Sequence, residues 1–325
     1  MNGQMRTSAE CACGVTRLAP SPTGALHLGN ARTFVVNWAL ARQRGWRVVL
    51  RIEDLDTPRV KAGAIEETIE TLAWLGLDWD EGPFVQSDDV EVYREAMRRL
   101  VSRGRVYACG LSRGEVEAAA SAPQEGVHEV RFGRELRPEA MNARFDDEAT
   151  NWRLVVDEGV VEFVDGFCGA TRVDVAGEVG DFVVWTRRGQ PAYQLAVVVD
   201  DARQGVTEVV RGDDLLGSAG RQVLVQEALG FGRRPRYTHL PLVRGADGRR
   251  LAKRHGDTRL STYRQMGVSA AAIVGLIARW SGVEGGAAMS AAEFAAKFVL
   301  ERMPREDVVF GKEDEAWLMD NTSGV

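Results

Sequence analysis

Cysteine is scarce in this sequence: the 325 residues contain four, at positions 11, 13, 109 and 168. Their spacing fits neither a disulfide framework nor a paired C-x-x-C zinc site. Cys11 and Cys13 could supply two metal ligands, but in a polar N-terminal tail they are expected to be reduced bystanders. The sequence therefore predicts no metal site on the protein.

Long apolar runs are also missing. No stretch of about 18 apolar residues occurs, so a membrane-spanning helix is not expected, and the first residues, MNGQMRTSAECACG, lack the apolar core of a signal peptide. With 45% hydrophobic and 27% charged residues the composition is that of a globular protein. A cytoplasmic protein of roughly two domains that makes no membrane contact is expected.

Lysine is rare, since only four of the 41 Lys and Arg residues are lysines. The net charge of -6 gives no overall attraction to nucleic acid, so any RNA contact would need a local basic face. Against this arginine-rich background Lys253 stands out.

The most informative segment present is Val15–Arg32, VTRLAPSPTGALHLGNAR. A short strand runs into a turn with Pro and Gly and then into a helix beginning near Asn30. Such a junction directs free N–H groups and the positive helix end at one point, which suits a phosphate. His27 stands at the mouth of that helix, and Gly24 and Gly29 allow close backbone approach. By themselves these residues fit a plain strand–helix connection equally well.

The following residues continue a βαβ pattern. Residues 31–44 have helical apolar spacing, Gly45 stands where the helix stops, and residues 46–52 form an apolar strand. This unit favours a parallel sheet whose ligand crevice lies at the carboxyl ends of the strands, where Glu53 falls.

Further elements follow along the chain. Helices are expected at 61–75, 92–103 and 218–229, paired strands at 152–157 and 160–165, and further strands at 181–186, 192–199 and 206–210. The apolar run Ala192–Val199, AYQLAVVV, is interpreted as a strand covered on both faces. The expected α/β organisation is a flexible tail at 1–14, a catalytic domain in two halves at 15–105 and 186–257, an inserted subdomain at 106–185, and a helical C-terminal region at 258–325.

Three motifs carry a family resemblance. PSPTGALHLGNAR resembles the "HIGH" signature of class I aminoacyl-tRNA synthetases in its glutamyl form, Arg51–Asp56 follows it, and Arg250–Gly256 is similar to the "KMSKS" loop. All three occur in the family's order over about 240 residues, a far more specific signal than one motif. The resemblance implies a split Rossmann-type parallel sheet with an inserted α+β acceptor-type subdomain.

The resemblance also implies ATP chemistry with Mg²⁺. Amino-acid activation is attack of a carboxylate on the α-phosphate of ATP, so the protein mainly positions reactants and stabilises charge. His27, with Gly29 and Asn30, is expected to bind the phosphates, and Lys253 to stabilise the transition state and the departing pyrophosphate. The loop departs from the family pattern at Arg250 and Ala252, which replace a lysine and a serine, so a basic surface loop is the alternative interpretation.

Glutamate recognition needs cations for carboxylates and an anion for the ammonium, and arginine can bind a carboxylate bidentately. The family's amino-acid contacts match Arg17, Leu18, Ala19, Pro20, Ser21, Glu53, Tyr193 and Arg211 in this sequence. Arg59 is a weaker candidate, because a surface arginine at a helix start explains it as well.

The chain ends before the large anticodon-binding region of full glutamyl-tRNA synthetases, and VGDFVV and AYQLAVVVDD are similar to a shorter group in the family. That group attaches activated glutamate to the queuosine base at the wobble position of tRNA(Asp). Many of its members hold zinc, but here Cys109 lacks the partner ligands and residues 128–136 offer none, so zinc is not expected. The expected partners are L-glutamate, ATP and queuosine-containing tRNA(Asp), and a monomer is expected.

Three interpretations remain open. The chain modifies queuosine, or it is a truncated enzyme that charges the 3′ end of tRNA, or it is a non-catalytic nucleotide- or tRNA-binding paralogue, for which Arg250 and Ala252 are the argument. A dinucleotide dehydrogenase is disfavoured because no G-x-G-x-x-G follows the first strand.

Overall fold

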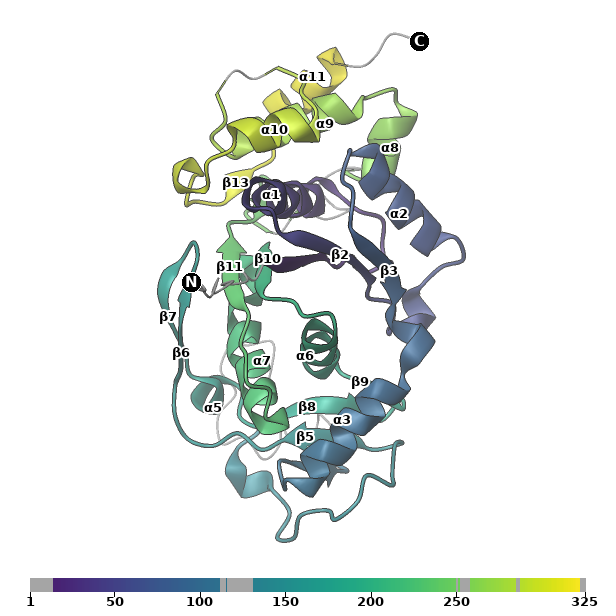
Figure 1. The fold of residues 1–325 in the computed structure, drawn as a ribbon, viewed down its shortest axis with the longest axis vertical. Helices are drawn as coiled ribbons and strands as arrows, with labels where there is room; N and C mark the ends of the chain where they lie inside the picture. The colour runs from purple at the N-terminus through teal and green to yellow at the C-terminus, as the bar shows by residue number, and fades with distance from the viewer. Residues whose placement is uncertain are drawn as a thin grey trace, which may run out of the picture.

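Parallel strands form the centre of the fold in this computed structural model, which describes residues 14–111, 115, 131–249, 251, 258–284 and 287–321. One sheet has the order β1 (Val15–Leu18), β2 (Arg47–Ile52), β3 (Glu81–Val85), and β10 (Glu208–Gly212) pairs in parallel with β11 (Arg236–Leu240). Thr207 links the two groups: its N–H donates to the Val15 carbonyl at 2.9 Å, and its Oγ1 accepts from the Val15 N–H at 3.0 Å. The strands therefore form one layer (Figure 1).

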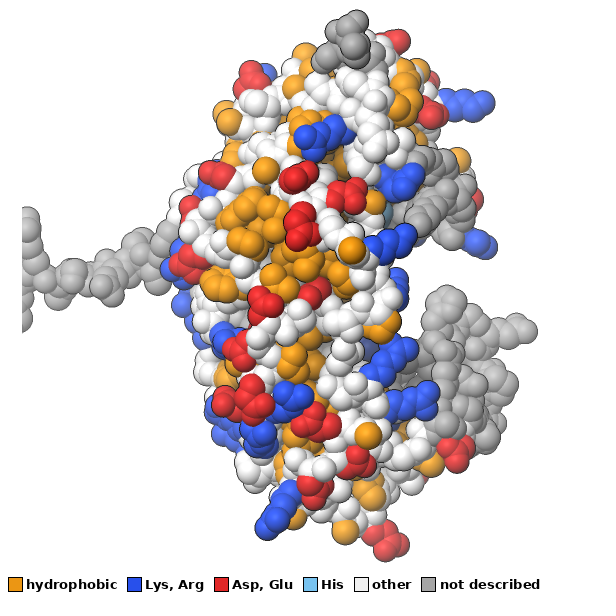
Figure 2. Space-filling view, turned by 90° about the vertical axis from the view of Figure 1, so that its right-hand side faces the viewer, with side chains coloured by type: hydrophobic (Ala, Val, Ile, Leu, Met, Phe, Trp, Pro, Cys, Tyr) orange, Lys and Arg blue, Asp and Glu red, His pale blue; other side chains and the backbone are white. Residues whose placement is uncertain are grey.

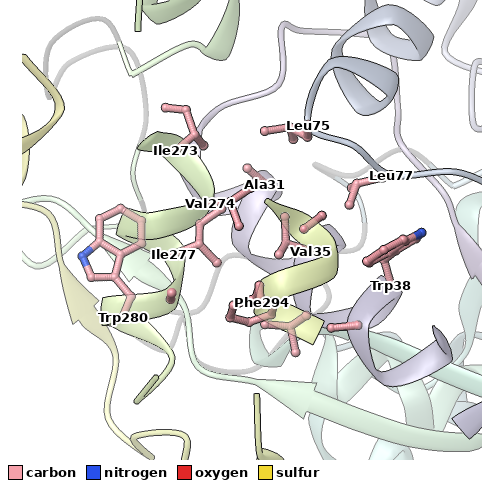
Figure 3. Close-up of a cluster of buried hydrophobic side chains, with 14 of the residues drawn as sticks. Ala31, Val35, Trp38, Leu75, Leu77, Ile273, Val274, Ile277, Trp280 and Phe294 are labelled. Atoms are coloured by element: carbon pink, nitrogen blue, oxygen red, sulfur yellow. The ribbon is translucent and has the colours of Figure 1, made fainter. Parts of the chain in front are cut away.

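Helix α1 (Leu28–Arg44) packs between this layer and the C-terminal helices (Figure 1). Its apolar face, including Ala31 and Val35, meets α9 (Ala270–Trp280) and α10 (Ala291–Lys297) in the largest buried cluster (Figure 3). The buried Arg32 donates to the carbonyl oxygens of Pro241 at 2.6 Å and Trp280 at 3.1 Å, and burial lowers its pKa to about 10. The motif-bearing helix is thus tied to both sides of the core.

Residues 106–191 contain an antiparallel sheet in the order β4 (Val106–Cys109), β5 (Asn151–Leu154), β8 (Phe182–Thr186), β9 (Gln190–Pro191). They also contain a hairpin of β6 (Val161–Asp165) and β7 (Gly169–Val173). The remaining elements are α2 (Ala64–Trp74), α3 (Glu91–Ser102), α5 (Val175–Glu178), α6 (Tyr193–Arg203), α7 (Leu216–Leu229), α8 (Leu260–Gln265), α11 (Lys312–Asp320) and the pair β12 (Val243–Arg244) and β13 (Val308–Val309). Among the described residues no helix combines the length and apolar character that a membrane crossing requires.

The surface carries both signs of charge. Figure 2 shows acidic and hydrophobic side chains over the middle of one face, Lys and Arg side chains along its right-hand edge, and a further group of them at the lower left. The negative net charge is therefore unevenly distributed.

Three sequence predictions of secondary structure were wrong. The apolar run Ala192–Val199 begins helix α6, whose residues 194–201 are all buried. A helix surrounded by other elements is apolar on every side, and its pattern cannot be told from that of a buried strand. The predicted pairing of 152–157 with 160–165 does not occur, because β5 pairs with β4 and β8, and β6 with β7. Strand β3 was missed because its sequence, EGPFV, contains Gly and Pro.

Candidate active site

A cavity of about 130 Å³ opens where the parallel strands end. Eight of the twelve predicted site residues line it: Arg17, Ala19, His27, Gly29, Asn30, Glu53, Tyr193 and Arg211. The other four are placed differently. Leu18 is fully buried in the core, Pro20 and Ser21 are absent from the described lining, and Lys253 lies outside the described residues. Arg59 pairs with Asp56 at the surface, with 69% of its side chain exposed.

The amino end of α1 forms one wall of the cavity. His27 is the N-cap, and its N–H donates to the Asn30 side chain at 3.3 Å. The first N–H groups of a helix lack intrahelical partners. The N–H of Leu28 donates to the Thr258 carbonyl at 3.2 Å, and the next two residues, Gly29 and Asn30, line the cavity. A Cβ on Gly29 would lie 3.1 Å from the His27 ring, so glycine lets the imidazole rest against the helix. This wall suits a phosphate.

The KMSKS-like segment is anchored beside the same wall at both ends. The Leu251 N–H donates to the Val243 carbonyl at 3.1 Å, and the Leu260 N–H donates to the Leu26 carbonyl at 2.9 Å. His27 and Arg259 form an antiparallel backbone bridge. Residues 252–257 are outside the described residues; the flank before them contacts Val243 in the cavity lining, and the flank after them contacts the His27 motif.

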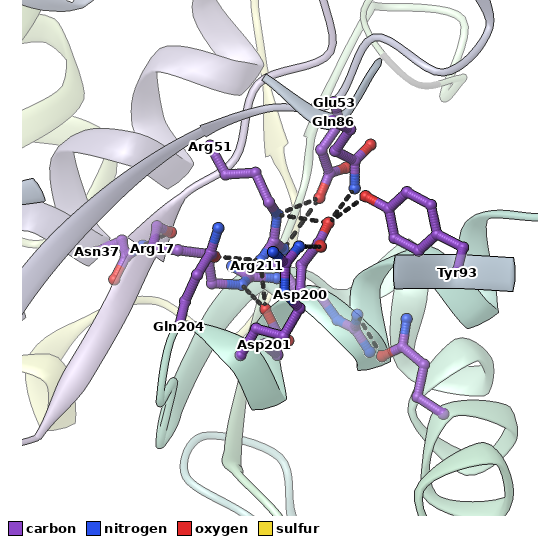
Figure 4. A network of polar contacts seen from close by, with 12 residues as sticks. Arg17, Asn37, Arg51, Glu53, Gln86, Tyr93, Asp200, Asp201, Gln204 and Arg211 are labelled. Carbon is purple, nitrogen blue, oxygen red and sulfur yellow. Dashed lines mark hydrogen bonds and ion pairs between the residues drawn. The ribbon is translucent and has the colours of Figure 1, made fainter. Parts of the chain in front are cut away.

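A buried ionic cluster holds Arg17 and Glu53 of the cavity lining (Figure 4). The fully buried Arg51 donates to Asp201 at 2.7 Å and to Glu53 at 3.1 Å, and its Nε lies 4.0 Å from Asp200. The Arg17 Nε lies 3.5 Å from Asp201. Two buried arginines thus face three carboxylates, and Arg203, which is about half exposed and pairs with Asp89, also approaches Asp200 at 3.9 Å. Glu53 is the carboxylate of this cluster that lines the cavity, where it could receive an ammonium group.

Glu53 and Tyr193, which both line the cavity, have shifted pKa values. Burial raises the pKa of Glu53 despite the opposing effect of Arg51 and Arg17. Burial, and after it the Glu53 carboxylate, raises the pKa of Tyr193, so its hydroxyl remains protonated. Tyr193 is the first residue of α6.

Arg211, at the end of β10, is a buried cation whose hydrogen-bond partners are neutral. Its Nε donates to His239 Nε2 at 3.0 Å, its Nη1 to the Gln222 Oε1 at 2.9 Å, and its Nη2 to the Leu215 carbonyl at 3.2 Å. Gln222 and the carbonyl are neutral, and burial and the Arg211 charge lower the pKa of His239, which keeps the imidazole neutral. Among the described residues no carboxylate forms an ion pair with this guanidinium, so its charge next to the cavity suits a carboxylate of a ligand.

Sequence reasoning missed the groups that hold these side chains. Arg51, Asp200 and Asp201 support Glu53 and Arg17, and Gln222 and His239 support Arg211. The Asp-Asp pair that follows an apolar run was the available signal, because two adjacent acids next to buried residues need partners. Nothing in the sequence pointed to Gln222 or His239.

No group of three or more His, Cys, Asp or Glu residues suited to a metal occurs among the described residues. The atoms that could hold ATP are the backbone N–H groups at the start of α1 together with His27.

Comparison with known proteins agrees with this geometry. A family profile described as the catalytic domain of class I tRNA synthetases (E and Q) matches residues 15–316. The chain belongs to this family. The match confirms the predicted family and the Rossmann-type fold class, and a member of this family uses ATP.

Several curated members of the family are similar over nearly the whole chain. Glutamyl-Q tRNA(Asp) synthetase of Symbiobacterium thermophilum is 45% identical over 96% of this chain and 99% of its own length. The protein of that name from Rhodopirellula baltica is 45% identical over 86% of this chain and 87% of its own. Glutamate–tRNA ligase of Geobacter sulfurreducens is 37% identical over 93% of this chain but only 64% of its own length.

A solved class I synthetase has the same fold. Glutamate tRNA ligase of Elizabethkingia meningosepticum, solved in complex with its amino acid, matches 94% of this chain and 68% of its own, with a TM-score of 0.78 and 26% identity.

Proposed function

We propose that this class I synthetase activates L-glutamate with ATP to glutamyl-adenylate and transfers the glutamate to the queuosine base of tRNA(Asp). The observation that carries the activation step is the charge arrangement in one cavity. A carboxylate at Glu53 and a cation at Arg211 line the same cavity as Tyr193, next to the amino end of α1. A zwitterionic amino acid with a second carboxylate complements this arrangement.

The residues then take the following roles. The carboxylate cluster that includes Glu53 holds the ammonium, and Arg211 holds a carboxylate of glutamate. Arg17 and Ala19 stand where β1 ends and orient the amino acid. His27, Gly29 and Asn30 hold the phosphates of ATP, which enters with Mg²⁺. To Lys253, in the KMSKS-like segment, we assign stabilisation of the leaving pyrophosphate; the bond from Leu260, just after that segment, to Leu26 beside His27 supports this role.

The acceptor is supported by the relatives. Two proteins 45% identical to this chain are named glutamyl-Q tRNA(Asp) synthetase, and both match it over more than four fifths of their length. The edge of Lys and Arg side chains in Figure 2 offers the local basic surface that an RNA partner needs in a chain of net negative charge. We propose a monomer that holds no structural zinc.

Activation is tested by exchange of labelled pyrophosphate into ATP with glutamate present and RNA absent. Glutamate-dependent exchange is expected, and Arg211→Met should raise the KM for glutamate more than the KM for ATP. The matched control is Arg98→Met, since Arg98 forms an exposed pair with Glu91 far along α3. Exchange at background level in the wild type would reject activation. The non-catalytic paralogue would then be the remaining interpretation.

Transfer is tested with tRNA(Asp) that contains or lacks queuosine. After glutamylation the RNA is digested to nucleosides and the glutamate is located by mass. Glutamate on queuosine is expected.

The second candidate is charging of a tRNA 3′ end, favoured by the 37% identity to glutamate–tRNA ligase. Periodate oxidation destroys the terminal ribose diol, so it separates the two reactions. Glutamate on the terminal adenosine of tRNA(Glu), with none on queuosine, would establish the second candidate in place of the first.

A further inference from the structure

A buried chain of hydrogen bonds lies behind Arg211. His239 on β11 is fully buried, and its Nδ1 lies 2.7 Å from Oδ2 of Asp165, the last residue of β6, which is also buried. Oδ1 of Asp165 accepts from the backbone N–H groups of Phe167 and Cys168, both at 2.9 Å, and of His239 at 3.1 Å. Asp165 therefore has a fixed orientation.

The chain determines where the imidazole proton lies. The Nε of Arg211 always bears hydrogen, so His239 Nε2, at 3.0 Å from it, can only accept. The proton of the neutral ring must then be on Nδ1, from which it is donated to Asp165. Tyr237 supports the arrangement, since its ring stacks on His239 at 5.9 Å and lies 5.2 Å from the Arg211 guanidinium.

We infer that Asp165 and His239 are positioning residues that aim Arg211 at the substrate by fixing the imidazole in the Nδ1–H form. A guanidinium has five N–H donors. His239, Gln222 and the Leu215 carbonyl take three of them, and two remain, which is the number that a bidentate carboxylate accepts. This inference rests on the proposed role of Arg211 in holding glutamate, and it assigns substrate orientation to residues outside the cavity lining.

The decisive variant is Asp165→Asn. Three backbone donors keep the amide oxygen at the Oδ1 position, so the NH₂ group replaces Oδ2 and donates to His239 Nδ1. The proton must then move to Nε2, where it meets the Nε–H of Arg211. We expect the KM for glutamate to rise roughly ten- to a hundredfold, the range for losing a hydrogen bond to a charged group, with the KM for ATP little changed.

His239→Gln provides the conservative comparison. Its amide oxygen can accept from Arg211 without any tautomer, so Asp165→Asn should raise the glutamate KM much less in the His239→Gln background than in the wild type. Asp174→Asn is the matched control. Asp174 likewise accepts a backbone N–H, that of Gly177 at 2.8 Å, but no imidazole is bonded to it. Equal effects of Asp165→Asn in both backgrounds would reduce Asp165 to a structural role and overturn the inference.

A second readout does not depend on activity. Nitrogen-15 NMR distinguishes the two imidazole tautomers, and the chain has four histidines, so His239→Gln assigns the signal. The Nδ1–H form is expected in the wild type and the Nε2–H form in Asp165→Asn. An Nδ1–H signal that persists in Asp165→Asn overturns the inference. If the wild type shows no glutamate-dependent exchange while the tautomer switches as expected, the proposed function fails and the hydrogen-bond chain stands.

Discussion

Removal of the Arg51 charge is expected to destabilise the protein strongly. Arg51 is fully buried and does not line the site cavity, yet its guanidinium donates to Asp201 and Gln204, at 2.7 and 2.8 Å, and to Glu53 at 3.1 Å. In Arg51→Met the side chain keeps much of its volume, but Glu53 loses its ion pair with Arg51, and Asp201 and Asp200 keep only the longer ionic contacts with Arg17 at 3.5 Å and with Arg203 at 3.9 Å. The variant thus tests electrostatics rather than packing.

The magnitude follows from the burial of the cluster. Breaking a buried ion pair from one side costs about 3 to 5 kcal/mol, because the remaining charge lacks compensation. That loss changes the ratio of folded to unfolded protein by roughly a hundred- to several-thousandfold. Burial already raises the pKa values of Glu53 and Asp200 in the wild type, and loss of Arg51 should raise them further.

The loss of stability in Arg51→Met should depend on pH in a definite direction. A carboxylate whose pKa is higher in the folded than in the unfolded chain binds more protons when folded, so stability falls as pH rises through that range. The free energy of unfolding of Arg51→Met, relative to the wild type, should therefore decline as pH rises above the ordinary carboxylate pKa of about 4.

The assay is urea unfolding of both proteins across this pH range. Arg98→Met is the control. Its pair with Glu91 is about half exposed on both sides, so it should cost about 1 kcal/mol or less. A loss in Arg51→Met no larger than in this control, or one independent of pH, would refute the reasoning about the cluster.

Three further predictions concern single groups. Lys253→Ala should lower kcat about a hundredfold, or roughly 3 kcal/mol, while the glutamate KM changes little, because its charge acts on the leaving pyrophosphate; an unchanged rate would assign the loop to the surface. Burial lowers the pKa of His239 from 6.5, so the unfolded protein takes up this proton at a higher pH than the folded protein does. The free energy of unfolding of the wild type should therefore decrease as pH falls below about 6.5, and His239→Gln should lessen this decrease. Parallel pH profiles of the two proteins in urea unfolding would contradict this. Elemental analysis should find no stoichiometric zinc. About one zinc per chain would contradict the expectation that Cys109 lacks partner ligands for a zinc site.

Local signals in the sequence predicted several elements correctly. The spacing of apolar residues and the stop at Gly45, which has a φ of 63°, gave helix α1, and the apolar segment before Glu53 gave β2. Helix α6 was mistaken for a strand because an all-apolar run fits either element. Its helical form depends on its surroundings, α3, α7 and β8, which lie elsewhere in the sequence.

The sequence by itself determined the family, the parallel strand–helix pattern, and eight cavity residues that stand at strand ends or helix starts. These follow from short-range order, since parallel strands bring their carboxyl ends to one edge whatever surrounds them. Tertiary structure alone decided the charge balance of the site. Arg51 and Asp201 are 150 positions apart, and Asp165 and His239 are 74 apart. A buried charge needs a partner, but the partner is chosen by packing in three dimensions, which no local pattern encodes.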